Sequence, residues 1–236
     1  MSQVHQQADA DPSILRFSMD AKATVKVGPF SRGGKNRTGV RACDHDFKTD
    51  ANLTPWGLLL PLHDELTLYF TESKVTSDFI VDMLERWWLD NGNRFPQVKT
   101  LMLDLDNGPE NHSRRTQFMA RIMGFAHKYQ LNIRLVYYPP YHSKYNRIER
   151  CWGILENHWN GDLLDSVDTV LKFAKSMTWK GKHPVVELVQ GIYQTGVKLS
   201  AKAMAALESQ LHRLPDLGKW FVDILVSTPA PAGSEI

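Results

Sequence analysis

The chain has 236 residues, 42% of them hydrophobic and 23% charged, with a formal net charge of +2 at pH 7. This length can bury the core of one sizeable globular domain, and no apolar run approaches the roughly 18 residues of a membrane span. The two cysteines, Cys43 and Cys151, form no Cys-x-x-Cys pair, which argues against a disulfide framework and a structural zinc site. We expect a soluble cytoplasmic protein that has no signal peptide and does not enter the membrane.

The predicted elements follow one another as strands first and then as alternating helices and strands. Residues 1–12 are polar and are expected to be disordered. The predicted strands are Ile14 to Met19, Thr24 to Val27, Trp56 to Leu60, Leu66 to Phe70, Leu101 to Leu105 and Ile133 to Tyr138. The predicted helices between and after them are Ser77 to Leu89, Arg115 to Tyr129 and one that carries Glu149. This order favours an α/β fold, in which helices cover both faces of a mixed sheet whose first strands are antiparallel.

The last third of the chain is less informative and is interpreted as an extension of the core. We expect a catalytic core at 13–162, a mostly helical extension at 163–226 and a disordered tail rich in Pro, Gly and Ser at 227–236. Two helices and two short paired strands are predicted within the extension: Val167 to Met177, Ser200 to Leu214, Thr195 to Leu199 and Trp220 to Leu225. Ser200 has the side chain of a good helix N-cap.

The segment YPPYHSKYNRIERCW at 138–152 is the most informative in the chain. Two prolines end a strand, and a helix then opens with apolar residues at three- and four-residue steps: Tyr145, Ile148, Trp152, Leu155 and Trp159. Asn146, Glu149 and Gly153 form a neighbouring stripe, which places Glu149 between core and cleft. An ordinary solvated helix acid is the alternative interpretation of Glu149.

The charge is unevenly distributed, which indicates a polyanionic partner. Five basic residues and no acid lie between Lys26 and Arg41, and eight basic residues lie between His112 and Arg150 with Glu149 as the only acid. Nucleic acid is the first candidate for such a partner. The residues expected to hold phosphates are Arg32, Lys35, Arg37, Lys144, Arg147 and Arg150.

Three acids stand where catalysis would require them. Asp20 ends the first strand, Asp106 ends the Leu101 to Leu105 strand, and Glu149 lies on the last helix of the core. If the two strands are parallel neighbours, both aspartates emerge at one edge of the sheet. Three converging carboxylates would repel each other without cations, and their oxygens suit two Mg²⁺ or Mn²⁺ ions.

Two asparagines are candidates for a supporting role around these acids, and one further acid competes for the second ligand position. Asn107 could orient the Asp106 carboxylate or a water, and Asn146 lies beside Glu149 on its helix. Asp104, two residues before Asp106, is the alternative second ligand. LDLDNG also resembles the strand end of haloacid-dehalogenase-type phosphatases, with Asp104 as nucleophile and Asp106 as acid. That interpretation requires Thr or Val after Asn107 and a later Lys followed by paired aspartates, and the sequence has neither.

The motifs FSMDAKATVKVGPFSRGG, LDNGPENHSRRTQF and YPPYHSKYNRIERCWG resemble the three catalytic segments of Rhodopirellula-type insertion-sequence transposases. The resemblance covers about residues 14–225 and implies the RNase H-like fold of DDE transposases. It implies that Asp20, Asp106 and Glu149 hold two Mg²⁺ ions, that DNA is cut at the element's ends, and that the 3′-hydroxyl is joined to target DNA. It further implies double-stranded DNA as partner, a homo-oligomer on DNA, and work at the prokaryotic nucleoid.

Two departures from the family pattern keep alternatives open. Arg147 stands where the wider group often has Pro, and a basic side chain there could meet a phosphate. Asp20 lies so near the start that we expect no preceding DNA-binding helical domain, as in a catalytic fragment, a separately encoded piece or a decayed element. The alternatives are an RNase H-like nuclease without strand transfer and a catalytically silent DNA-binding remnant.

Overall fold

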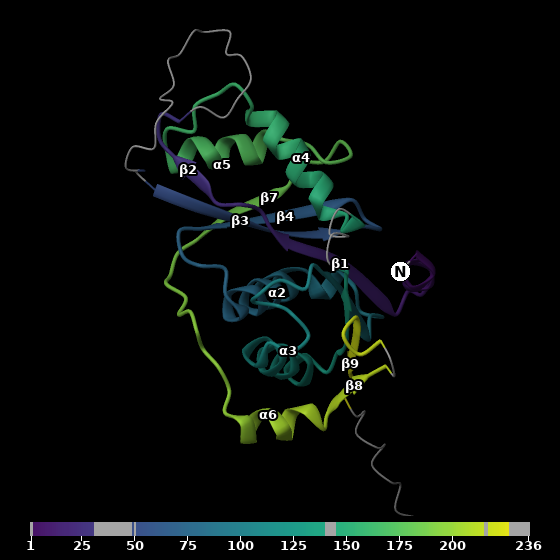
Figure 1. The fold of residues 1–236 in the computed structure, drawn as a ribbon. Coiled ribbons are helices and arrows are strands. Elements are labelled where there is room, and N and C mark those ends of the chain that lie inside the picture. Colours follow the sequence, from purple (N-terminus) through teal and green to yellow (C-terminus); the bar gives the residue numbers. More distant parts are fainter. Residues whose placement is uncertain (1, 31–48, 50, 140–144, 215–216, 227–236) are drawn as a thin grey trace, which may run out of the picture.

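The computed structural model describes residues 2–30, 49, 51–139, 145–214 and 217–226, which form one mixed sheet between layers of helices (Figure 1). The strands are β1 (Ile14–Ala21), β2 (Val25–Val27), β3 (Ala51–Leu60), β4 (Glu65–Thr71), β5 (Thr100–Leu105), β6 (Asn132–Tyr137), β7 (Val185–Val189), β8 (Leu211–Arg213) and β9 (Phe221–Ile224). The helices are α1 (Ser2–Ala10), α2 (Ser77–Asn91), α3 (Thr116–Tyr129), α4 (Ile148–Trp159), α5 (Val167–Ser176) and α6 (Ala201–Glu208), with a 3₁₀ turn at Gly92–Arg94.

The strand order confirms the expected RNase H-like fold. Within the described residues the order is β7-β4-β3-β1-β5-β6-β9-β8, and β2 pairs with β3 outside this path. β1, β3 and β4 are antiparallel neighbours, whereas β1, β5 and β6 run parallel. The first strands therefore form a meander, and the later strands return through crossover helices.

Alternation along the central strands gives the sheet two buried faces. On β1, Phe17 and Met19 pack with α2 and α3, whereas Ser18 and Asp20 point to the opposite face. That opposite face is covered by α4 and α5, which pack on β2, β3 and β4 (Figure 1). The helices on the two faces make the central strands β1 and β5 the most enclosed part of the molecule.

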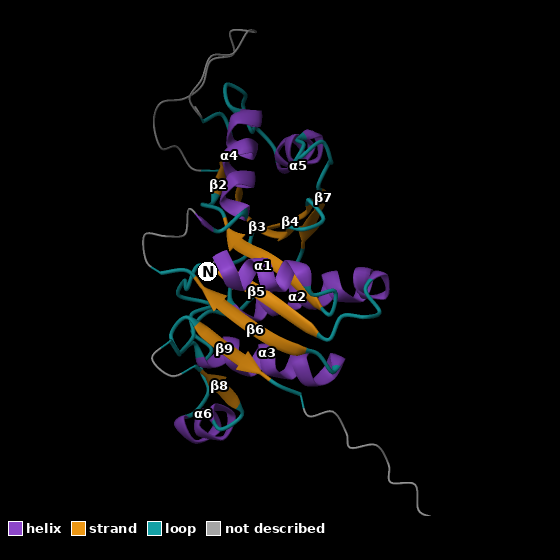
Figure 2. Cartoon of the chain, turned by 90° about the vertical axis from the view of Figure 1, so that its right-hand side faces the viewer, coloured by secondary structure: helices purple, strands orange, loops and turns teal. Residues whose placement is uncertain are grey.

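The N-terminal segment differs from its prediction. Residues 1–12 were expected to be disordered, yet Ser2–Ala10 form α1, which lies over β5 and β6 (Figure 2). Ala8 packs on Met102 and Val136, and Asp9 accepts two hydrogen bonds from Arg16 on β1. The polar composition that suggested disorder instead supplies ligands for a buried arginine, so the prediction of disorder is wrong for the described part of this segment.

The C-terminal extension contributes to the same sheet and is less helical than expected. β7 pairs parallel with β4 at one edge, and β9 pairs antiparallel with β6 near the other. The predicted helix Ser200 to Leu214 ends at Glu208, and Leu211–Arg213 form β8, which pairs with β9 in place of the predicted partner Thr195 to Leu199. Ser200 is the N-cap as predicted, and its hydroxyl accepts from the backbone N–H of Ala203. The boundary at residue 162 stays a prediction, and the tail at 227–236 lies outside the described residues.

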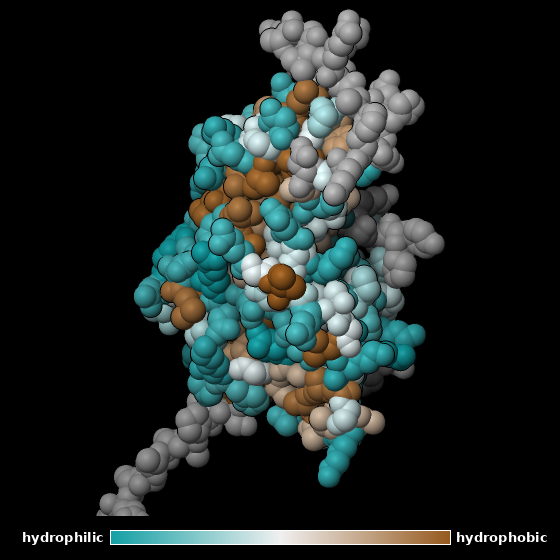
Figure 3. All heavy atoms as spheres, turned by 90° about the vertical axis from the view of Figure 1, so that its left-hand side faces the viewer, coloured by the Kyte–Doolittle hydropathy of each residue, from teal (hydrophilic) through white to brown (hydrophobic). Residues whose placement is uncertain are grey.

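The surface carries a few exposed apolar side chains. Tyr145, predicted to belong to the buried stripe of α4, is 59% exposed because it precedes the helix, while Ile148, Trp152, Leu155 and Trp159 are buried as predicted. On the side seen in Figure 3, apolar residues gather towards the end that holds α5, and hydrophilic residues interrupt them lower down. Among the described residues, no helix is long and apolar enough to cross a membrane.

Candidate active site

Asp20 and Asp106 lie at the same edge of the sheet. β1 and β5 are parallel with Ser18 opposite Asp104, and the two chains continue from that pair to Asp20 and Asp106. Both aspartates line one small pocket of about 130 Å³, together with Trp56 and the loop that follows β5. The sequence prediction that the two strands are parallel neighbours is therefore confirmed.

The loop after β5 folds around the Asp106 carboxylate. Its Oδ1 atom accepts hydrogen bonds from the backbone N–H of Gly108 (3.1 Å) and from Nδ2 of Asn111 (2.9 Å). A Cβ atom at Gly108 would lie 2.9 Å from Oδ2 of Asp106, so only glycine lets the loop approach this closely. These contacts fix one oxygen of Asp106 and leave the carboxylate at the pocket wall.

The supporting asparagine in this loop is a different one from that predicted. Asn107 adopts a left-handed backbone (φ 61°), which asparagine tolerates, and its side chain accepts from the backbone N–H of Ser113. Asn107 thus shapes the turn, and Asn111 contacts Asp106. The Asn-Gly pair signalled a turn, but nothing in the spacing indicated that the asparagine five residues after Asp106 would fold back onto it.

Asn146 holds the start of α4 against β1. It is fully buried, its Nδ2 atom donates to the carbonyl of Met19 (3.1 Å), and its Oδ1 atom accepts from the hydroxyl of Ser18. The same hydroxyl accepts from the backbone N–H of Ile148, the first residue of the helix (3.0 Å). Ser18 and Met19 directly precede Asp20, so Asn146 anchors the helix beside the first carboxylate.

A second contact fixes the direction of α4 along β1. Glu156 forms an ion pair with Lys22 (2.7 Å), two residues after Asp20. Asn146 and Glu156 are about 15 Å apart along the helix, and their partners on the strand are separated by about 13 Å, so the two elements run side by side in the same direction. Glu149 lies between these anchors, three residues after Asn146 and seven before Glu156, on the helix stripe that faces the end of β1.

Gly57 allows this close approach of helix and sheet. It pairs with Asp20 across β1 and β3, and its missing side chain faces α4. A Cβ atom there would lie 2.6 Å from Cδ1 of Ile148 and 2.7 Å from the ring of Trp152. A glycine opposite Asp20 is thus the sequence feature that brings the Glu149 helix down onto the site, and sequence reasoning missed it.

The electrostatics of Asp20 reflect the gathering of negative charge. Burial first, and then the charges of Asp106 and Glu149, raise the pKa of Asp20 to about 8, against the lowering effects of the Ala21 backbone N–H and the Trp152 indole. The indole N–H of Trp152 lies close enough to Asp20 to lower its pKa. Within the described residues, however, this N–H forms no hydrogen bond of normal geometry. Asp20 therefore sits among like charges without a balancing cation from the described chain.

Asp104 has a different role. It is fully buried beneath α1, where its oxygens bind Nη1 of Arg16 (3.0 Å) and Nε2 of His5 (3.1 Å). With both oxygens engaged and no access to solvent, Asp104 cannot serve as the nucleophile of the phosphatase interpretation. Its engagement leaves Asp106 as the acid of this strand that faces the pocket.

The donor chemistry fits a hard divalent cation, although the carboxylates stand apart. Among the described residues no group of three or more His, Cys, Asp or Glu side chains is arranged to hold a metal ion. Asp20, Asp106 and Glu149 repel one another, and a divalent cation would draw their oxygens together. Carboxylate oxygens at an open pocket are the ligands that Mg²⁺ and Mn²⁺ prefer.

The predicted phosphate-binding residues divide into two groups. Arg147 and Arg150 are exposed at the first turn of α4, next to Glu149. Arg32, Lys35, Arg37 and Lys144 lie outside the described residues. Several other basic residues between 112 and 150 pair with acids elsewhere in the fold: Arg115 with Glu110, Arg121 with Asp78 and Asp82, Lys128 with Glu85 and Arg134 with Asp223.

Comparisons with known proteins identify the family. The family model described as the Rhodopirellula transposase DDE domain matches residues 1–226. No functionally curated protein sequence matches the chain significantly. Among solved structures, the chain is similar to the "Mos1 transposase paired-end complex with left transposon end", with 11% sequence identity and a TM-score of 0.49. That match covers 72% of this chain and 49% of the Mos1 transposase chain, so this chain spans about half the length of the Mos1 transposase.

The sheet is RNase H-like and has acids at the ends of two parallel central strands, β1 and β5. The chain belongs to the Rhodopirellula transposase DDE domain family, because that family's model covers almost its entire length. The assignment rests on the sequence match together with the strand order.

Proposed function

We propose that this chain is the catalytic domain of an insertion-sequence transposase that cuts phosphodiester bonds at the element's ends and joins the 3′-hydroxyl to target DNA. The observation that carries the proposal is the placement of α4. Asn146 and Glu156 attach this helix to β1 on either side of Asp20, so that Glu149 lies across from Asp20 and Asp106. The effect of the Asp106 and Glu149 charges on the pKa of Asp20 supports the proposal that these three acids form one site.

Asp20, Asp106 and Glu149 are the residues that would hold the metal. Two Mg²⁺ ions, when bound, activate an attacking oxygen and stabilise the leaving one during in-line displacement at phosphorus. The protein's own contribution is positional: Asn111 and Gly108 orient Asp106, and Asn146 orients the segment before Asp20. Arg147 and Arg150, exposed beside Glu149, would hold DNA phosphates near the acids without reading the sequence.

The partners follow from this chemistry. The substrate would be double-stranded DNA, first at the element's ends and then at the target, and joining two ends to one target requires more than one copy of the chain. We therefore propose a homo-oligomer assembled on DNA at the prokaryotic nucleoid. Arg32, Lys35, Arg37 and Lys144 remain part of the proposed DNA contact.

The proposal is tested with duplex DNA taken from both sides of this coding sequence, incubated with the purified chain and Mg²⁺ or Mn²⁺. Cleavage and joining of a pre-cut end are each measured. We expect Asp20→Asn, Asp106→Asn and Glu149→Gln to lower both rates at least about 10³-fold, because metal-assisted charge stabilisation contributes several kcal/mol.

The matched control is Asp168→Asn on α5, an exposed acid that pairs with Lys172, which should leave both rates unchanged. Cleavage without joining would identify a nuclease. DNA binding with neither reaction under either metal would overturn the catalytic proposal and identify a silent binding remnant.

A further inference from the structure

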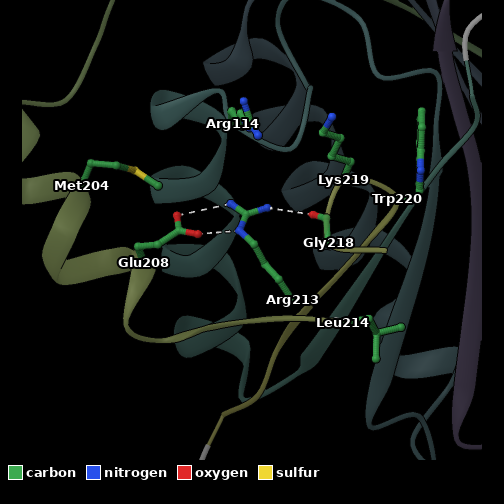
Figure 4. A pocket seen from close by; sticks show the side chains of 8 residues that line it. All are labelled: Arg114, Met204, Glu208, Arg213, Leu214, Gly218, Lys219 and Trp220. Carbon is green, nitrogen blue, oxygen red and sulfur yellow. Dashed lines mark hydrogen bonds and ion pairs between the residues drawn. The ribbon is translucent and has the colours of Figure 1, made fainter. Parts of the chain in front are cut away.

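A hollow on the C-terminal extension lies outside the carboxylate pocket. It has a volume of about 860 Å³, within the usual range of ligand sites. Its lining comes from the loop after β5, from α6 and from the β8–β9 turn (Figure 4): Arg114, Met204, Glu208, Arg213, Leu214, Gly218, Lys219 and Trp220. We refer to this hollow as the β9 pocket.

The β9 pocket opens at the same edge of the sheet as the acids. β9 runs antiparallel to β6 with Phe221 opposite Val136, so Trp220 stands at the carboxyl end of β6. Its carbonyl accepts from the backbone N–H of Tyr137, the last residue of that strand (2.9 Å). Asp106 stands at the carboxyl end of β5, the next strand. The two sites are therefore neighbours along one edge.

Arg213 connects the pocket directly to the loop that holds Asp106. Its guanidinium donates to the carbonyl of Ser113 (2.8 Å), to the carbonyl of Gly218 (3.2 Å) and to the carboxylate of Glu208 (Figure 4). Ser113 in turn donates its backbone N–H to Asn107, the residue after Asp106. The loop that follows β5 therefore contacts Asp106 and also lines the β9 pocket, through Arg114.

The lining has the chemistry of a nucleotide site. Arg213 is neutralised by Glu208, but among the described residues no acid pairs with Arg114 or Lys219, which are both exposed. Arg114 differs in this respect from Arg115, Arg121, Lys128 and Arg134, which all form ion pairs. Next to the two cations lie an indole and a leucine side chain, a surface suited to a sugar and a base.

We propose that the β9 pocket binds one nucleotide of the DNA strand that leaves the catalytic edge, with its phosphate at Arg114 and Lys219 and its sugar and base against Leu214 and Trp220. The inference rests on the proposed function and adds a contact site to it. In the sheet, β9 lies two strand spacings from β5, which is about 10 Å, and β8 lies three spacings from β5, which is about 14 Å. The bound nucleotide therefore lies a few positions along the strand from the cut.

The test measures DNA binding alone, in EDTA, by anisotropy of fluorescein-labelled 20-nucleotide single strands and duplexes over a range of NaCl concentrations. For Arg114→Ala/Lys219→Ala we expect the slope of log K against log [NaCl] to fall by about 1. The affinity at 0.1 M NaCl should fall about tenfold. Trp220→Ala should weaken single-strand binding about fivefold or more, and Trp220→Phe should restore most of it.

The matched control is Lys172→Ala/Lys175→Ala, which removes two exposed charges from α5 at the other end of the sheet. It should leave the slope within error of wild type. A pocket variant that keeps the wild-type slope and affinity overturns this inference and leaves the proposed function standing. A chain that binds DNA through the pocket but never cleaves it overturns the proposed function and leaves this inference standing.

Discussion

Asp104 and Asp106 lie two residues apart at the end of the same chain segment, yet their surroundings are opposite. Asp104 is buried with Arg16 and His5, and Arg16 also binds Asp9 of α1. Asp106 lines the same pocket as Asp20, where burial and then the charges of Asp106 and Glu149 raise the pKa of Asp20 to about 8. One carboxylate is balanced by cations from the chain, and the other belongs to an excess of negative charge.

A structural acid and a candidate catalytic acid two residues apart are distinguished by whether a cation of the chain pairs with the carboxylate. A buried carboxylate that holds an arginine stabilises the fold only while both partners remain. A group of acids with no cation from the described chain is kept at a cost in stability, which a bound divalent cation would offset.

Asp104→Asn should destabilise the protein far more than Asp106→Asn. Removing one member of a buried ion pair costs about 3–5 kcal/mol, and the lower end applies here because Asp9 still neutralises part of the Arg16 charge. The free energy of unfolding is measured with urea at pH 7. Equal losses for the two variants would contradict the contrast between the paired and the unbalanced acid.

Asp20→Asn should stabilise the metal-free protein, and more so at high pH. Because the folded-state pKa of about 8 lies above the unfolded value of 3.8, folded Asp20 binds more protons between these values. Its contribution to stability is therefore present at low pH and is lost as the pH rises to about 8. The gain from Asn should be roughly 2–4 kcal/mol larger at pH 9 than at pH 5.

The measurement is urea unfolding in EDTA at several pH values, with Asp168→Asn as the matched control because that side chain is exposed on α5. A pH-independent difference between Asp20→Asn and wild type would show that folding does not raise the pKa of Asp20.

Gly57→Ala should push α4 away from the sheet, because the added methyl group would overlap Ile148 and Trp152. Overpacking of this kind costs about 1–3 kcal/mol of stability. It should also separate Glu149 from Asp20, so that the cleavage rate falls by more than the stability loss explains. Gly153→Ala on α4 is the control, since a Cβ atom there meets nothing within 4 Å. Unchanged cleavage in a folded Gly57→Ala protein would contradict the role given to this glycine.

Mg²⁺ should raise the unfolding temperature of wild type at pH 8 and leave Asp106→Asn almost unaffected. A ligand at about ten times its dissociation constant adds about 1.4 kcal/mol to the free energy of unfolding. Calorimetry with and without Mg²⁺ measures this effect. The same shift in Asp104→Asn as in wild type would place the ion at Asp106, whereas its loss only in Asp104→Asn would place the ion beneath α1.

The sequence was sufficient for much of the fold, because local patterns decided it. The Pro-Pro stop before the α4 segment, the apolar stripe of α4 and the Ser200 cap all predicted elements that the structure contains. The α1 helix was missed because it is held by tertiary contacts, His5 with Asp104 and Ala8 with Met102, that join residues more than 90 positions apart. β8 was predicted as helix because the helix formers Gln210, Leu211 and Arg213 continue past Glu208, whereas pairing with β9 decided the outcome.

By itself, the sequence determined the order of strands and helices along the core, the identity of the three candidate acids and the family, since these depend on periodicity and on motifs of neighbouring residues. Only the tertiary structure decided which acid of LDLDNG faces the pocket and which asparagine supports it. It also decided that Gly57 admits α4 and that Arg115, Arg121, Lys128 and Arg134 form ion pairs within the fold. Most of these outcomes depend on contacts between segments far apart in the chain, such as Arg16 with Asp104 and Gly57 with Trp152, and local pattern carries no information about such pairings.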